Sequence, residues 1–129
     1  MLKPSTSILV VEDNSQNMRL MSDILNAAGY QVLQAEDGSQ GWKLAQEHRP
    51  GLILMDIQLP DISGLEVTKR LKNDKELKSI PIIAVTAFAM VGDKEKIIEA
   101  GCDGYIPKPF SVPDVLQTVK RYCCATIDA

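Results

Sequence analysis

The chain has 129 residues with a formal net charge of −3, and 45% of its residues are hydrophobic and 24% charged. This length predicts a single domain that can bury a hydrophobic core, and an acidic balance with scattered basic residues argues against nucleic-acid binding. Because the sequence has neither a secretory signal nor the run of about 20 apolar residues that spans a membrane, we expect no membrane insertion and a cytoplasmic location.

Five short apolar segments, predicted as strands, alternate with five segments of helical periodicity. The predicted strands cover residues 8–11, 30–35, 52–55, 81–85 and 103–106. The predicted helices begin after Asn14 or Ser15, after the turn of residues 36–38, after Ser63, near residue 90 and after Ser111, and they end near residues 28, 48, 72, 100 and 123. This alternation predicts an α/β fold with a parallel sheet and helices on both faces. We expect one domain over residues 1–129, with a core over about 7–124 and no output domain.

The central predicted strand, residues 52–55, runs directly into Asp56, and Pro60 ends the regular structure four residues later. Its apolar residues do not alternate with polar ones, which predicts a strand buried on both faces. In open α/β sheets, ligands bind at the carboxyl ends of the strands. Asp56 therefore lies where a functional carboxylate is expected.

Other polar side chains follow neighbouring strands at the same edge of the predicted sheet. Glu12 and Asp13 end the first strand, Thr86 ends the fourth, and Lys108 follows the fifth. In the strand order 2-1-3-4-5, the first and third strands are neighbours, so the three carboxylates come together.

Three carboxylates in one pocket repel one another unless a cation offsets their charge. Oxygen ligands of this kind suit Mg²⁺, and a lysine and a hydroxyl nearby suit a phosphoryl group. Asp56 is then a candidate nucleophile that forms an aspartyl phosphate. Taken singly, these residues have ordinary explanations as helix caps, loop charges or a surface lysine; their convergence at one sheet edge favours a functional site.

Four motifs in this order resemble the receiver domain of two-component response regulators: Val-Val-Glu-Asp-Asn, Leu-Met-Asp-Ile-Gln-Leu-Pro-x-x-Ser-Gly, Ala-Val-Thr-Ala and Lys-Pro-Phe. The resemblance covers residues 8–124, and residues 54–90 are particularly similar to stand-alone regulators of bacterial cell division and polarity. It implies a flavodoxin-like (CheY-like) five-stranded parallel sheet. It also implies a regulatory domain of a phosphorelay rather than an enzyme.

In such a domain, Asp56 would take a phosphoryl group from a phosphohistidine of a histidine kinase or a histidine phosphotransfer protein. The resemblance implies that Asp13, Asp56 and the backbone carbonyl of Gln58 would bind Mg²⁺, for which Mn²⁺ can substitute. Glu12 would act on the metal largely through water.

The resemblance assigns the remaining site residues to the phosphoryl group and the switch. Lys108 would pair with the phosphoryl oxygens, and the Lys108-Pro109 peptide bond would be cis. Thr86 would hydrogen-bond the phosphoryl group, and Tyr105 would be the aromatic side chain that swings inward with it.

Gln58 and Phe88 occupy the positions that tune the dephosphorylation rate in this family, and the bulky Phe88 suggests a long-lived phosphoryl state. The face formed by the fourth helix, fifth strand and fifth helix would be read by a kinase or another effector protein. An alternative is a receiver that serves only as a phosphorelay intermediate.

Two other classes of protein fit less well. Haloacid-dehalogenase-type phosphatases also use an aspartyl nucleophile and Mg²⁺, but they resemble one another in a second Asp two residues later, where this chain has Gln58. Nucleotide-binding modules carry G-x-G-x-x-G or G-K-[ST], and neither pattern occurs in this sequence.

Overall fold

The computed structural model describes residues 7–87 and 91–127. The strands are β1 (Ser7–Val11), β2 (Gln31–Ala35), β3 (Leu52–Asp56), β4 (Ile82–Thr86) and β5 (Gly104–Pro107). The helices are α1 (Ser15–Ala27), α2 (Gly38–His48), α3 (Gly64–Lys72), α4 (Val91–Ala100) and α5 (Val112–Ile127). All strand pairs are parallel and the order is β2-β1-β3-β4-β5, which confirms the predicted fold class and topology.

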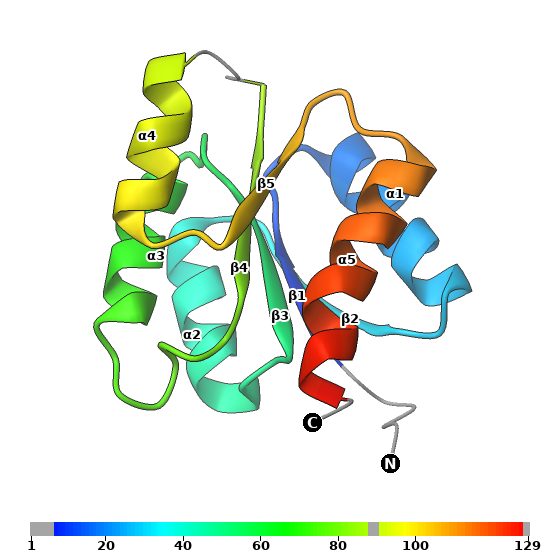
Figure 1. Cartoon of the computed structure of the whole chain (residues 1–129), viewed down its shortest axis with the longest axis horizontal. Coiled ribbons are helices and arrows are strands. Elements are labelled where there is room, and N and C mark those ends of the chain that lie inside the picture. The colour runs from blue at the N-terminus through cyan, green and yellow to red at the C-terminus, as the bar shows by residue number, and fades with distance from the viewer. Residues whose placement is uncertain (1–6, 88–90, 128–129) are drawn as a thin grey trace.

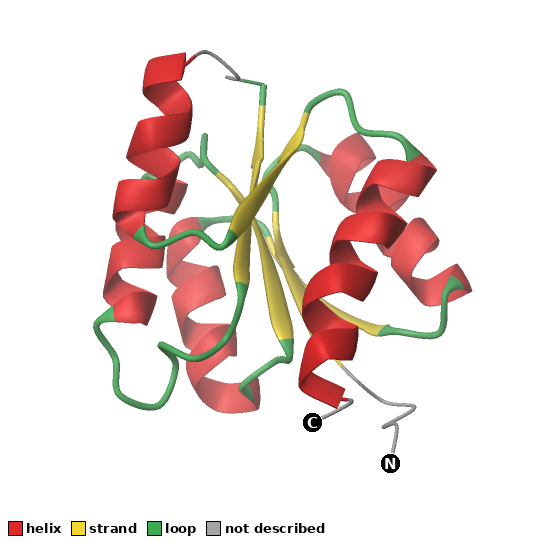
Figure 2. Ribbon diagram, viewed as in Figure 1, coloured by secondary structure: helices red, strands yellow, loops and turns green. Residues whose placement is uncertain are grey.

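Helices cover both faces of the sheet. Helices α1 and α5 pack on one face, and α2, α3 and α4 pack on the other (Figure 1). Figure 2 shows the strands as a single twisted layer between these two groups of helices. Within the described residues, no helix is long and apolar enough to cross a membrane.

The strands alternate their side chains between two hydrophobic cores, one beneath each group of helices. In β3, Leu52 and Leu54 face the core under α1 and α5, whereas Ile53 and Met55 face the other core. Every residue of β3 and of β4 is buried. This burial on both faces, predicted from the unbroken apolar run, makes β3 a firm support for Asp56 at its end.

Side-chain caps begin four of the helices, and the caps of α1, α3 and α5 are residues that the sequence predicts. Of the two candidates before α1, Asn14 is the cap, because its Oδ1 accepts the backbone N–H of Asn17 at 2.9 Å. Asp37 caps α2, Ser63 caps α3, and the Ser111 hydroxyl accepts the N–H of Asp114 at the start of α5. Such caps each contribute about 1 kcal/mol to helix stability.

Some element boundaries differ from the prediction. Strand β4 begins after Pro81, which has no N–H to donate to the sheet. Strand β5 begins at Gly104 rather than Asp103, whose side chain binds the Lys72 ammonium at 3.0 Å and the N–H of Ile82 at 2.8 Å. Helix α5 continues to Ile127, four residues past its predicted end.

Candidate functional site

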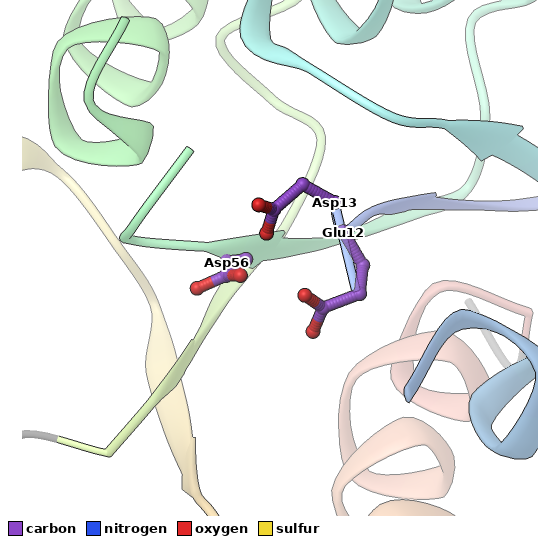
Figure 3. Close-up of side chains that lie close together, drawn as sticks. All are labelled: Glu12, Asp13 and Asp56. Atoms are coloured by element: carbon purple, nitrogen blue, oxygen red, sulfur yellow. The ribbon is translucent and has the colours of Figure 1, made fainter. Parts of the chain in front are cut away.

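Three carboxylates meet at the carboxyl edge of the sheet. Glu12 and Asp13 follow β1, and Asp56 is the last residue of β3, which pairs with β1 in the sheet. One oxygen from each of the three carboxylates lies within 4.8 Å of the other two. Figure 3 shows the three side chains close together. Glu12 and Asp56 are 4% exposed, whereas Asp13 is exposed, so the cluster lies at the border between the core and solvent.

Lys108 bridges the two buried carboxylates. Its Nζ lies 3.0 Å from Glu12 Oε1 and 3.2 Å from Asp56 Oδ2. The residue directly follows β5, and the Lys108-Pro109 peptide bond is cis, as the family resemblance implies. One ammonium therefore faces three carboxylates, which leaves negative charge at the site.

Burial and the contacts among these groups shift the pKa values of Glu12 and Lys108. Burial, followed by a hydrogen bond with Asp56, raises the pKa of Glu12 to about 7, although Lys108 works in the opposite direction. Burial lowers the pKa of Lys108, but its contacts with Glu12 and Asp56 outweigh this effect, and the net pKa is raised. Lys108 is therefore held in its charged form, whereas Glu12 keeps a proton to a higher pH than an ordinary glutamate does.

Backbone contacts fix the Asp56 carboxylate from its other side. The N–H of Gln58 donates to Asp56 Oδ1 at 3.0 Å, which leaves Oδ2 to Lys108. The loop of residues 57–63 starts here and returns at Gly64, whose N–H donates to the carbonyl of Ile57 at 2.9 Å. A Cβ at Gly64 would lie 2.1 Å from the backbone oxygen of Asp56, so this close approach requires glycine.

The expected switch residues lie on the two strands beyond β3. Thr86 is the last residue of β4, next to β3, and is 2% exposed. Tyr105 lies on β5 and is 37% exposed, with Lys94 Nζ 5.2 Å from the centroid of its ring. This spacing gives a cation–π contact at the surface. Phe88, the other expected rate-tuning residue, lies outside the described residues.

The donor set fits a hard divalent cation. Three carboxylates each supply an oxygen atom within 4.8 Å of the other two, and one of the carboxylates is exposed enough to leave water on the metal. Mg²⁺ typically takes one or two carboxylates and keeps several waters. The cluster therefore matches Mg²⁺ better than a metal that prefers nitrogen or sulfur ligands.

Residues 8–120 match the sequence model of a family described as the response regulator receiver domain. The chain belongs to this family. The polar-differentiation response regulator DivK of Brucella anthropi is 57% identical to this receiver domain over 116 residues, which cover 90% of the chain and 94% of DivK. DivK of Brucella ovis is 56% identical over the same length.

Solved structures show the same architecture. The receiver domain of the sensor histidine kinase PA1611 of Pseudomonas aeruginosa, with a magnesium ion in its active-site cleft, has a TM-score of 0.87 and 34% identity. It matches over 93% of this chain and 98% of its own length. The chemotaxis protein CheY4 of Vibrio cholerae has a TM-score of 0.87 and 29% identity, over 92% of this chain and 98% of its own.

The structure places Glu12, Asp13, Asp56, Thr86 and Lys108 at the carboxyl ends of their strands, but two features were not predicted. Glu12 contacts Lys108 directly, whereas the sequence predicts only an action of Glu12 on the metal. Asp61, inside the loop of residues 57–63, binds the start of α2, and no sequence pattern pointed to it. The individual roles of Gln58, Thr86 and Tyr105 stay predictions.

Proposed function

We propose that this receiver domain accepts a phosphoryl group on Asp56 from the phosphohistidine of a histidine kinase or a histidine phosphotransfer protein. The observation that carries the proposal is the setting of the Asp56 carboxylate. One oxygen is bound by the N–H of Gln58, the other by Lys108 Nζ, and two further carboxylates lie within 4.8 Å. A carboxylate oriented in this way can act as a nucleophile.

The transfer forms a bond between phosphorus and a carboxylate oxygen of Asp56 and breaks the phosphorus–nitrogen bond of the donor, which releases its histidine. The ammonium of Lys108 already contacts the Asp56 carboxylate, so it can also offset the negative charge of the new phosphoryl oxygens. Asp13, Asp56 and the carbonyl of Gln58 would hold Mg²⁺ or Mn²⁺, with Glu12 acting through water. Such a metal supplies charge neutralisation for the phosphoryl oxygens.

A hollow beside the site gives a protein donor a place to approach. It has a volume of about 330 Å³, and Lys108 lies at its border. Its other lining residues are mostly apolar: Asn17, Leu20, Ala87, Pro109 and Phe110. An apolar rim next to a charged centre suits contact with another protein better than contact with a small polar donor.

Phosphorylation would add about −1.5 to −2 charges and three acceptor oxygens at Asp56. The hydroxyl of Thr86 would turn towards these oxygens, and Tyr105 would move into the space that it leaves. The α4–β5–α5 face would then change its shape, and a kinase or other effector would read it, through a shift of an existing equilibrium. Gln58 and Phe88 would set the lifetime of the phosphoryl group.

The similarity to DivK supports a role in cell polarity or division for this receiver domain. The domain would catalyse only its own phosphorylation and dephosphorylation, and would act in the cytoplasm. It would pass its signal on by contact with a partner protein.

The test is the mass of the intact protein after incubation with acetyl phosphate and Mg²⁺. We expect the wild type to gain the mass of one phosphoryl group and Asp56→Asn to gain none. Asp23→Asn, which alters an exposed carboxylate on α1, is the matched control and should behave as the wild type. A gain in Asp56→Asn, or none in the wild type, would contradict the proposal.

A further inference from the structure

The carboxylate of Asp61 joins the loop of residues 57–63 to the start of α2. Its Oδ1 accepts the backbone N–H of Gly38 at 2.8 Å and that of Ile62 at 2.8 Å. Its Oδ2 accepts the N–H of Ser39 at 3.0 Å and the hydroxyl of Ser39 at 2.8 Å. Three of these four hydrogen bonds connect segments that are 22 or 23 residues apart in the chain.

Helix α2 does not depend on Asp61 for its cap. Asp37 already caps the helix, because its Oδ1 accepts the N–H of Gln40 at 2.8 Å. Asp61 instead uses the N–H groups of Gly38 and Ser39, which no carbonyl of the helix can reach. The helix start therefore offers the loop a fixed set of donors.

Steric contacts at Gly38 show how closely the loop lies on the helix. A Cβ at this position would lie 2.3 Å from Cγ2 of Ile62 and 3.0 Å from Cγ2 of Val67. Ile62 thus occupies the space that any other side chain at residue 38 would need. The loop rests directly on the backbone of α2, and Asp61 fastens it there.

The fastened loop is the one that begins at the phosphoryl-accepting residue. Gln58 lies two residues past Asp56 and three before Asp61, and its N–H is bonded to Asp56 Oδ1. The base of the loop is closed by the N–H of Gly64 on the carbonyl of Ile57. Asp61 adds a second attachment on the far side of Gln58, so this residue lies between two fixed points.

We propose that Asp61 is a positioning residue for the metal-binding and phosphoryl-accepting site. By holding the loop on α2, it holds the backbone carbonyl of Gln58 at the place where a metal bound by Asp13 and Asp56 would need it. This inference rests on the proposed function, since it assigns Gln58 to the metal. Asp61 would act through Gln58 rather than as a ligand of the metal or the phosphoryl group.

Loss of a group that holds a metal ligand in place typically weakens metal binding by about 10- to 100-fold. For Asp61→Ala we expect Mg²⁺ binding about 10-fold weaker, at the lower end of this range, because the base of the loop stays closed. Phosphorylation by acetyl phosphate should then need more Mg²⁺ to reach half of its maximal rate. The rate at saturating Mg²⁺ should stay near that of the wild type, because Asp56 and Lys108 are unchanged.

The experiment is a calorimetric Mg²⁺ titration of the wild type, Asp61→Ala, Asp61→Asn and Asp74→Ala, with thermal unfolding of each protein. Asp74 is the matched control: its Oδ1 accepts the N–H groups of Glu76 and Leu77 in the loop before β4, at the opposite edge of the sheet. Asp61→Asn should be intermediate, because an amide keeps one oxygen for Gly38 but places an NH₂ group against the N–H of Ser39.

The positioning role predicts that Mg²⁺ binding weakens in the order wild type, Asp61→Asn, Asp61→Ala, while Asp74→Ala loses stability without losing affinity. Equal Mg²⁺ affinity in Asp61→Ala and the wild type would overturn it, and so would an affinity that simply follows the unfolding temperature across all variants. A wild type that neither binds Mg²⁺ nor takes a phosphoryl group would instead overturn the proposed function on which the inference rests.

Discussion

The backbone N–H of Lys108 donates to the carbonyl oxygen of Thr86 at 2.8 Å. This bond extends the pairing of β4 with β5 beyond its last registered pair, Thr86 with Pro107. The two residues expected to contact the phosphoryl group are therefore joined through their backbones. A displacement at the end of β4 would carry Lys108 with it.

Removing the charge of Lys108 should destabilise the metal-free protein, because Glu12 and Asp56 would lose the cation that bridges them. For Lys108→Ala we expect a loss of about 2 kcal/mol in the free energy of unfolding, as for a hydrogen bond to a charged group. Mg²⁺ should raise the unfolding temperature of this variant more than that of the wild type. Thermal unfolding with Mg²⁺ or a chelator checks this, with the exposed Lys120→Ala as control. An equal response to Mg²⁺ in both proteins would contradict the bridging role.

Gly64→Ala should disturb the site although alanine favours helices. The new Cβ would lie 2.1 Å from the backbone oxygen of Asp56, which cannot move aside without moving the end of β3. Gly29→Ala is the matched control, because Gly29 has φ +95° but no atom within 4 Å of a built Cβ. Gly29→Ala should cost about 1–2 kcal/mol from backbone strain, and Gly64→Ala should cost more and also weaken Mg²⁺ binding. Comparable losses of stability in the two variants would show that the close contact at Gly64 is relieved.

The stability of the metal-free protein should depend on the protonation of Glu12. The pKa of Glu12 is raised from 4.5 to about 7 in the folded protein, chiefly by burial. The folded state therefore holds a proton that the unfolded state releases, and the resulting stabilisation is complete below pH 4.5 and lost as the pH rises through about 7. In Glu12→Gln the side chain is a neutral amide at every pH, so its contribution to stability does not change with protonation.

The measurement is the free energy of unfolding of the wild type and Glu12→Gln in a chelator, at pH values below 4.5 and above 7. The free energy of unfolding of Glu12→Gln, relative to that of the wild type, should be higher above pH 7 than below pH 4.5. A difference that does not change with pH would mean that the Glu12 carboxyl keeps its ordinary pKa in the folded protein.

Thr86→Ala should separate phosphorylation from its effect on β5. The variant keeps Asp56, Lys108 and the carboxylates, so acetyl phosphate and Mg²⁺ should still add a phosphoryl group. The NMR signals of Gly104, Tyr105 and Ile106 should shift less on phosphorylation than in the wild type. Shifts of equal size would show that the Thr86 hydroxyl does not couple Asp56 to β5.

The sheet and most of the site could be predicted because the signals are local. Unbroken apolar runs gave the buried strands, and parallel strands carry the residues that follow them to one edge, which brought Asp13, Asp56 and Lys108 together. The ion pair of Glu12 with Lys108 depends on which rotamers two long side chains adopt beside Asp56, and periodicity does not encode this.

Contacts between segments far apart in the chain could not be predicted from the sequence either. Asp61 lies in a loop, outside any helical or strand pattern. Its partners Gly38 and Ser39 precede it by more than 20 residues. The start of β5 was placed one residue too early for the same reason, because Asp103 reads as a strand residue until its contacts with Lys72 and Ile82 are known.

The two hydrophobic cores, separated by a sheet one residue thick, share no side chain among the described residues. A substitution beneath α1, such as at Met21, can therefore be accommodated without repacking Leu71 or Ile97 on the other side. The surface that borders Lys108 and the surface of α2 and α3 can diverge independently in evolution. The α4–β5–α5 face includes one helix from each layer, so substitutions in either core can affect it.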